Sequence, residues 1–302
     1  MSRRYEINTQ ISPQIAGLAE LAERYDAILC DVWGVLIDGR RHFPEAAAAL
    51  RAFRARGGVV ALITNASRPS EEVLRQLRGL GLPDDAHDAI VSAGELTLQE
   101  IVARGDQACF HLGPHRDDAL FEAAARRLGR AVRRVPPEAA DFVVCTGLVD
   151  DEAETPQDYD ERLAALRERG LVMLCANPDV VVGVGDRLYW CAGALARRYA
   201  ALGGEVKIFG KPETPIYDSA LAQLAEARGA PLERARVLAI GDGAETDLLG
   251  AARAHIDCLF VTGGVHRDEL LKPDGALDCA ALRALFARVG ADPAALAPRI
   301  VW

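Results

Sequence analysis

Four short apolar runs, each ending on a polar or charged residue, constrain the fold of this chain more than any other feature. The first, residues 27–30, ends at Asp31 and breaks at once into a turn that contains Gly34. Apolar runs of this length, bounded by turn residues, are typical of strands buried on both faces. The others end on Thr64 and Asn65, on Lys211, and on the pair Asp242 and Asp247. In an open parallel sheet, ligands bind beyond the carboxyl ends of the strands, so these ends predict a shared site.

Helical patterns separate these runs along the chain. The segments 45–56 and 70–80 follow Pro44 and Ser70 and are stopped by glycines, as helices often are. Strands that alternate with helices predict a parallel sheet covered on both sides, and therefore an α/β fold. Residues 12–25 also carry apolar side chains at helical spacing, which predicts one more helix before the first strand.

The long segment between Thr64 and Lys211 predicts a second domain. Strand-like runs at 108–112, 142–146 and 172–175 alternate with helical patterns here, and none of them ends on a site-like group. A chain of 302 residues is long enough for two domains. We therefore expect a core domain from residues 1–87 and 205–302, which includes the strand leading to Lys211, and an inserted domain from residues 88–204.

Composition excludes several classes of function. The chain has 35 Lys and Arg against 44 Asp and Glu, a net charge of −9, so electrostatics do not favour binding to nucleic acid or an anionic membrane. No apolar run reaches the roughly 18 residues of a membrane span, and the first residues show no signal-peptide pattern. The seven cysteines form no C-x-x-C pair and lie mostly in apolar runs, as in reduced proteins. The expected location is the cytoplasm.

Each strand end has an ordinary structural explanation when it is taken alone. Asp31 can cap a strand, Lys211 can be a surface lysine in a turn, and Gly241-Asp242-Gly243 can be a plain turn. Together they offer a carboxylate nucleophile, a hydroxyl group, an ammonium group and a pair of carboxylates. Phosphoryl transfer needs such groups for attack, for charge neutralisation and for Mg²⁺, which prefers oxygen ligands.

In this order the four motifs resemble those of the haloacid dehalogenase (HAD) superfamily: an aspartate nucleophile, a Ser or Thr, a lysine and an acidic pair. The long gap before Lys211, with Asn177-Pro178-Asp179 inside it, is similar to class IIA, the NagD-like and nitrophenylphosphatase-like branch. The first motif, Asp31-Val32-Trp33-Gly34-Val35, resembles that of one subgroup of this class. The resemblance implies a Rossmann-like core with an inserted α/β cap domain of the C2 type.

The resemblance also implies a role for each matched residue. Asp31 would be the nucleophile, with Lys211 as the catalytic cation. Thr64, Asn65 and Lys211 would hold the phosphate. The expected cofactor is Mg²⁺, and its implied ligands are Asp31, Asp242, Asp247 and the backbone carbonyl of Trp33.

One position departs from the family pattern. The family's phosphatases carry a second Asp, the general acid and base, two residues after the nucleophile, and here that position is Trp33. Asp38, a few residues further on, is an alternative proton donor. In the inserted domain, Asn177 and Asp179 fit either contacts with the substrate or an Asx-type turn that shapes the loop.

The function predicted from these residues is a Mg²⁺-dependent phosphatase that acts on a small phosphorylated metabolite through an aspartyl-phosphate at Asp31. An alternative is a weak or inactive relative that binds such a metabolite, because Trp33 replaces the usual acid. A third is a HAD enzyme acting on a phosphonate or a carbon–halogen bond; the latter would not need Asp242. A homodimer through the cap domain is also expected from the class.

Overall fold

Twelve strands and ten α-helices form the part of the chain that the structure, a computed structural model, describes: residues 12–184, 187–272 and 274–302. The chain start, where the sequence shows no signal-peptide pattern, lies outside these ranges. The strands are β1 (Ala27–Asp31), β2 (Val59–Thr64), β3 (Ala89–Ser92), β4 (Cys109–Leu112), β5 (Phe142–Cys145), β6 (Val172–Cys175), β7 (Val181–Val184), β8 (Arg187–Trp190), β9 (Val206–Ile208), β10 (Val237–Gly241), β11 (Asp257–Val261) and β12 (Ala295–Ala297).

The helices alternate with these strands, as the sequence predicts. They are α1 (Pro44–Ala55), α2 (Ser70–Gly79), α3 (Ala93–Ala103), α4 (Asp118–Leu128), α5 (Asp160–Glu168), α6 (Ala192–Ala201), α7 (Thr214–Arg228), α8 (Leu249–Arg253), α9 (Arg267–Leu270) and α10 (Cys279–Val289). None of the helices in the described ranges combines the length and hydropathy that crossing a bilayer requires.

The larger sheet is parallel and has the strand order β12-β11-β10-β1-β2-β3. Its central register pairs Cys30 of β1 with Ile240 of β10, and Asp31 with Ile63 of β2. The residues that follow these pairs, Asp242 and Thr64, therefore lie at the same edge of the sheet as Asp31. The predicted convergence of the strand ends is thus a result of the sheet's register.

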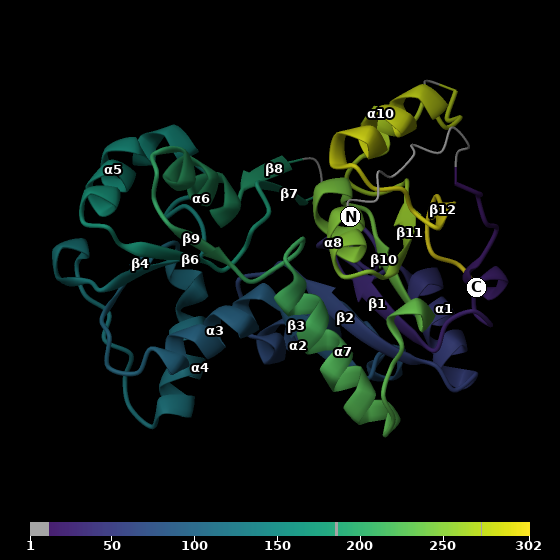
Figure 1. Cartoon of the computed structure of the whole chain (residues 1–302), viewed down its shortest axis with the longest axis horizontal. Helices are drawn as coiled ribbons and strands as arrows, with labels where there is room; N and C mark the ends of the chain where they lie inside the picture. Colours follow the sequence, from purple (N-terminus) through teal and green to yellow (C-terminus); the bar gives the residue numbers. More distant parts are fainter. Residues whose placement is uncertain (1–11, 185–186, 273) are drawn as a thin grey trace, which may run out of the picture.

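Alternate residues of β1 face two separate hydrophobic layers. Ile28 and Cys30 pack with α1 and α2 on one face, whereas Ala27 and Leu29 pack with α7, α8 and α10 on the other. In Figure 1 the green helix α7 lies across strands β2 and β3. All four β1 residues are fully buried, as expected for a central strand of a doubly covered parallel sheet.

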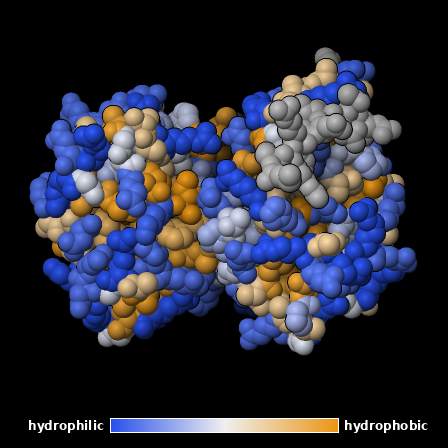
Figure 2. Space-filling view, viewed as in Figure 1, coloured by the Kyte–Doolittle hydropathy of each residue, from blue (hydrophilic) through white to orange (hydrophobic). Residues whose placement is uncertain are grey.

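A second parallel sheet, of order β4-β5-β6-β9, forms the other lobe of the molecule, together with the antiparallel hairpin β7-β8 (Figure 1). Helices α5 and α6 cover one face of this sheet, and α3 and α4 cover the other. The space-filling view shows the two lobes joined at a narrower waist (Figure 2). The expected α/β fold with an inserted α/β cap is confirmed.

Two segments pair with the sheet on the other side of the predicted domain boundary, and only the first of them was predicted to be a strand. The strand before Lys211, Val206–Ile208, is an edge strand of the small sheet, where it pairs with β6. Ala89–Ser92, which we expected to open the inserted domain, instead pairs with β2 in the large sheet. Both strands are short edge strands, and nothing in a strand of three or four residues specifies which sheet it joins.

One further local expectation needs correction. The predicted helix over 12–25 is only a short 3₁₀ turn, Leu18–Glu20, because the backbone of Ile15 donates to Leu296 of β12 and that of Leu18 to Val301. The chain therefore runs along β12 instead of coiling. Strand β12 itself and the hairpin β7-β8 were not predicted at all.

We propose that the two sheets mark two domains, with the small domain spanning residues 93–208. Matched truncations in the two cores test this division. Leu62 and Leu163 are both fully buried, in the large and the small domain respectively. Leu62→Ala and Leu163→Ala should each cost about 2–5 kcal/mol, the usual range for a buried leucine.

If the domains unfold separately, each variant should shift only one of two transitions in scanning calorimetry. Equal shifts of one shared transition by both variants would contradict the proposed division.

Candidate active site

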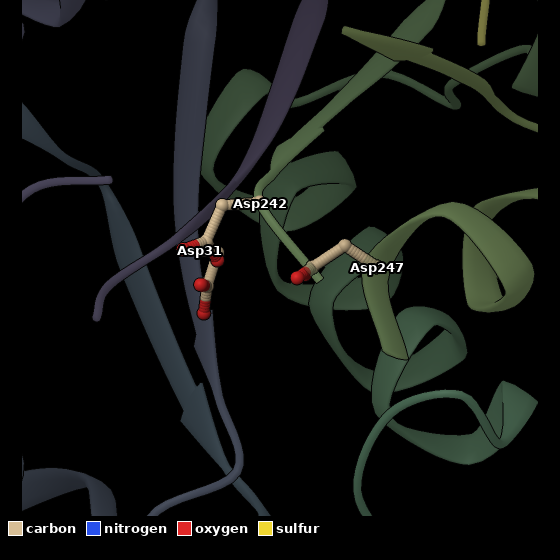
Figure 3. Close-up of side chains that lie close together, drawn as sticks. All are labelled: Asp31, Asp242 and Asp247. Atoms are coloured by element: carbon tan, nitrogen blue, oxygen red, sulfur yellow. The ribbon is translucent and has the colours of Figure 1, made fainter. Parts of the chain in front are cut away.

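Three buried carboxylates meet at the carboxyl edge of the large sheet. Asp31 ends β1, Asp242 follows β10, and Asp247 lies in a π-helical turn, Ala244–Leu248, that leads into α8. One oxygen from each carboxylate lies within 4.8 Å of the others. Figure 3 shows Asp247 directed toward the other two side chains. This arrangement is the acidic cluster that the strand ends predicted.

Lys211 neutralises part of this charge. Its Nζ donates to Oδ1 of Asp31 at 2.5 Å and to Oδ1 of Asp247 at 2.7 Å, and all three side chains are buried. Burial alone would lower the pKa of Lys211, but the charges of Asp247 and Asp31 raise it well above its usual value. The lysine is therefore a permanent cation, not a surface residue in a turn.

The cluster still carries more negative than positive charge. Three carboxylates face one ammonium group, which leaves two negative charges when all are ionised. Burial, together with the charge of Asp247, raises the pKa of Asp31 well above its usual value and that of Asp242 to about 7. A dication bound between these oxygens would remove the excess charge, and carboxylate oxygens are the ligands that hard cations prefer.

Two glycines give the Asp242 carboxylate its space. A Cβ on Gly264 would lie 1.9 Å from Oδ2 of Asp242, and one on Gly34 would lie 2.0 Å from the same atom. Gly34 also has a φ of 78°, which side chains rarely tolerate. The backbone amide of Val265 donates to this oxygen at 2.7 Å. The backbone therefore fixes the orientation of Asp242 closely, as a metal ligand requires.

Asn65 has a different environment from the one expected of a phosphate ligand. Its Nδ2 donates to Oδ1 of Asp179 at 2.8 Å and to the carbonyl of Lys211 at 3.2 Å, while its Oδ1 accepts from the Lys211 amide at 2.7 Å. The side-chain amide thus holds the backbone of Lys211. Thr64 also lines the pocket, and its Oγ1 accepts from the Ala66 amide at 3.3 Å.

Both predicted residues of the small domain take part in the loop after β6. The backbone amide of Asp179 donates to Oδ1 of Asn177 at 3.1 Å, which is an Asx-type turn. The carboxylate of Asp179 accepts from Asn65, so this loop also connects the small domain to the large one. Burial raises the pKa of Asp179, and the hydrogen bond from Asn65 lowers it in part.

A pocket of about 780 Å³ opens above the cluster and is lined by both domains. It includes every side chain that the sequence singled out: Asp31, Trp33, Asp38, Thr64, Asn65, Asn177, Asp179, Lys211, Asp242 and Asp247. Trp33 is partly buried against the core of the large domain. The pocket also holds groups that the sequence analysis missed: Arg68, Arg116, Asp117, Thr146 and Asp151, and the hairpin residues Tyr189 and Trp190.

Asp38 lies at the pocket, but it is poorly suited to donate a proton. Its Oδ1 accepts from the amides of Arg40 and Arg41, both at 2.9 Å, and its side chain is 38% exposed. Burial is the largest single effect and raises its pKa, but these hydrogen bonds and the charge of Arg41 together outweigh it and lower the pKa. The carboxyl group is therefore ionised at neutral pH.

The strand-end rule that identified Asp31 could also have flagged two of the missed residues. Thr146 directly follows β5, and Asp117 lies five residues after the end of β4. Neither run was treated as ending on a site-like group, although Thr146 offers a hydroxyl group as Thr64 does. The hairpin gave no such signal, because its position over the pocket depends on tertiary structure.

Two family models match this chain. One describes haloacid dehalogenase-like hydrolases and matches residues 28–126, and the other describes HAD-hydrolase-like proteins and matches residues 208–285. A crystal structure of a haloacid dehalogenase-like hydrolase from Brucella suis is 44% identical, covers 96% of this chain and 100% of its own, and superposes with a TM-score of 0.82.

Curated relatives are more distant. The D-glycerol 3-phosphate phosphatase of Mycobacterium tuberculosis is 28% identical over 82% of this chain and 66% of its own length, so the chain spans about two thirds of that relative. The ribonucleotide monophosphatase NagD of Escherichia coli is 25% identical over 79% of this chain and 88% of its own. The 44% identity along the full length of the Brucella protein carries the conclusion: this chain is a hydrolase of the haloacid dehalogenase-like family.

Proposed function

We propose that this hydrolase is a Mg²⁺-dependent phosphatase that transfers the phosphoryl group of a small phosphorylated metabolite to Asp31 and then to water. The observation that carries the proposal is the contact between the buried Asp31 carboxylate and Lys211 Nζ, at 2.5 Å, on the floor of the pocket. Curated relatives named as phosphatases, among them a glycerol phosphate phosphatase and a nitrophenylphosphatase, support the reaction type.

Asp31 would attack phosphorus with one carboxylate oxygen while the bond to the leaving oxygen breaks. A carboxylate needs no general base for this step, and the acyl-phosphate that forms is hydrolysed by water in a second step. Lys211 fixes the attacking side chain and stabilises negative charge on the transferring group. Because Asn65 holds both backbone polar groups of Lys211, we assign Asn65 a positioning role.

The metal would be held by Asp31, Asp242 and Asp247, with the backbone carbonyl of Trp33 as a further oxygen ligand. The site fits such an ion: the cluster has an excess of two negative charges, and the backbone at Gly34 and Gly264 leaves room only for the Asp242 carboxylate. A bound Mg²⁺ would reduce the repulsion between the anionic nucleophile and the anionic phosphate.

The described part of the site lacks a proton donor for the leaving oxygen. An alkoxide leaves slowly without a proton donor, Trp33 cannot donate one, and Asp38 is ionised at neutral pH. General acid–base help is worth about 10²–10⁴-fold in rate. Because the site lacks this contribution to the rate, a second candidate function is the binding of a phosphorylated metabolite with little turnover. A panel of phosphate esters, assayed with and without Mg²⁺, separates the two functions.

Turnover is expected to depend strongly on the leaving group. With Mg²⁺, 4-nitrophenyl phosphate should be hydrolysed about 10²–10⁴-fold faster than propyl phosphate, because nitrophenolate leaves without a proton. Asp31→Asn should abolish both activities. Trp33→Asp should raise the rate with propyl phosphate, provided circular dichroism shows that the variant folds.

Asp38→Asn is the matched control for this prediction and should leave the ratio of the two rates unchanged. Similar rates for both esters in the wild type, with loss of the propyl phosphate activity in Asp38→Asn, would contradict our assignment and make Asp38 the acid.

The space beside Asp242 should matter for metal binding. Gly264→Ala brings a methyl group against Oδ2 of Asp242, so the carboxylate must move, and we expect at least a tenfold weaker affinity for Mg²⁺ in calorimetry. The φ of Gly264 is not positive, so the substitution tests space and not backbone conformation.

Gly79→Ala provides the comparison for this variant. Gly79 ends α2, its φ is also not positive, and a Cβ there meets no described atom within 4 Å. It should bind Mg²⁺ as the wild type does. Equal affinities in all three proteins would count against the metal site.

A further inference from the structure

One buried carboxyl group in the pocket has no part in the reaction above. Asp117 directly precedes α4 in the small domain, and only 4% of its surface is exposed. It lines the same pocket as Asp31. Burying a carboxyl group costs free energy unless its oxygens are well hydrogen-bonded. The burial of Asp117 therefore needs a structural or functional reason.

The usual structural tasks of such a residue do not explain Asp117. Aspartate before a helix normally accepts hydrogen bonds from the first turn, yet Asp117 accepts none in α4, a helix that the structure describes completely. It also forms no ion pair with any described residue, whereas its neighbour Asp118 pairs with Arg134. A residue that departs from its local role in this way is typical of functional sites.

The surroundings of Asp117 are polar and ordered. The hydroxyl groups of Thr146 and Ser67 lie close enough to it to lower its pKa, and Ser67 belongs to the loop after Thr64 in the large domain. Thr146 Oγ1 also lies 3.0 Å from His111 Nε2, and burial lowers the pKa of His111 to about 4, so this imidazole is neutral at pH 7. The carboxyl group is thus held at the junction of the two domains.

The nearby cations are already engaged elsewhere. Arg116 forms an ion pair with Asp151, and Arg68 donates to Gln76 Oε1 at 3.0 Å. Burial raises the pKa of Asp117, while the nearby hydroxyl groups of Thr146 and Ser67 and the charges of Arg116 and Arg68 lower it only in part. Two carboxyl oxygens can accept about four hydrogen bonds, so acceptor positions stay free even if both neighbouring hydroxyl groups donate to them.

We propose that Asp117 is a specificity-determining residue that accepts a hydrogen bond from a hydroxyl or ammonium group on the leaving group of the substrate. The inference rests on the proposed function, because it assumes that the phosphate lies at Asp31 and the leaving group extends toward the small domain. It selects phosphate esters with a hydrogen-bond donor on the leaving group over unsubstituted alkyl esters.

Three alkyl phosphates test the inference with the same type of leaving oxygen: glycerol 3-phosphate, phosphoethanolamine and propyl phosphate. The wild type should favour one or both of the first two over propyl phosphate in kcat/KM, and which one it favours identifies the donor as hydroxyl or ammonium. Asp117→Ala should raise KM for the favoured ester about 10–100-fold and leave KM for propyl phosphate nearly unchanged.

Asp118→Asn is the matched control, since Asp118 is the next residue and does not line the pocket. It should retain the preference of the wild type. Should Asp117→Ala fail to fold, Asp117→Asn keeps the shape and one acceptor oxygen and should show a smaller rise in KM for the favoured ester alone.

An unchanged preference in Asp117→Ala overturns the inference. So does an equal fall in kcat with all three alkyl esters while 4-nitrophenyl phosphate is spared, since that pattern marks a proton donor. Failure of the proposed function is a separate result, namely no Mg²⁺-dependent turnover of 4-nitrophenyl phosphate by the wild type. In that case, the affinity of each of the three esters is measured by calorimetry. Equal affinities of the wild type and Asp117→Ala for every ester overturn the inference.

Discussion

The ion cluster of Lys211 with Asp31 and Asp247 is the interaction on which the rest of the site depends. Buried charges are stable only when they are paired and well hydrogen-bonded, and here one ammonium group serves two carboxylates at 2.5 and 2.7 Å. The cluster is possible because β1 and β10 are adjacent in the parallel sheet and end at the same level. Removing the lysine would leave three carboxylates together in a buried site, so its role in structure and its role in chemistry cannot be separated.

The parts of the fold that could be predicted from sequence are those with a strong local signal. β1, β2 and β10 are continuous apolar runs that end on chemically distinctive residues, and both their type and their common edge follow from that pattern. The sheet membership of β3 and β9 could not be predicted, because each is short and is placed by its partner strand. The expected helix over 12–25 failed for a related reason: pairing with β12 outweighed a helical spacing of apolar residues.

The same distinction applies to the site. Asp31, Lys211 and the acidic pair could be singled out because their order along the chain is itself informative. Asn65 lines the pocket, but its hydrogen bonds to Asp179 and to the backbone of Lys211 depend on residues more than a hundred positions away. Asp117 lies five residues beyond the end of β4, where the strand-end pattern could have drawn attention to it, but only the structure shows that it is buried, does not cap α4 and forms no ion pair with a described residue.

The hydrogen bonds of Asn65 have a mechanical consequence. One amide group holds the loop of Asp179 in the small domain and the backbone of Lys211 in the large domain. Any hinge motion that separates the lobes must first break the bond between Asn65 and Asp179, and this leaves a buried donor unsatisfied until water enters. If Lys211 acts in catalysis as proposed, the same side chain would therefore link separation of the two lobes, and with it release of product, to the position of the ammonium group.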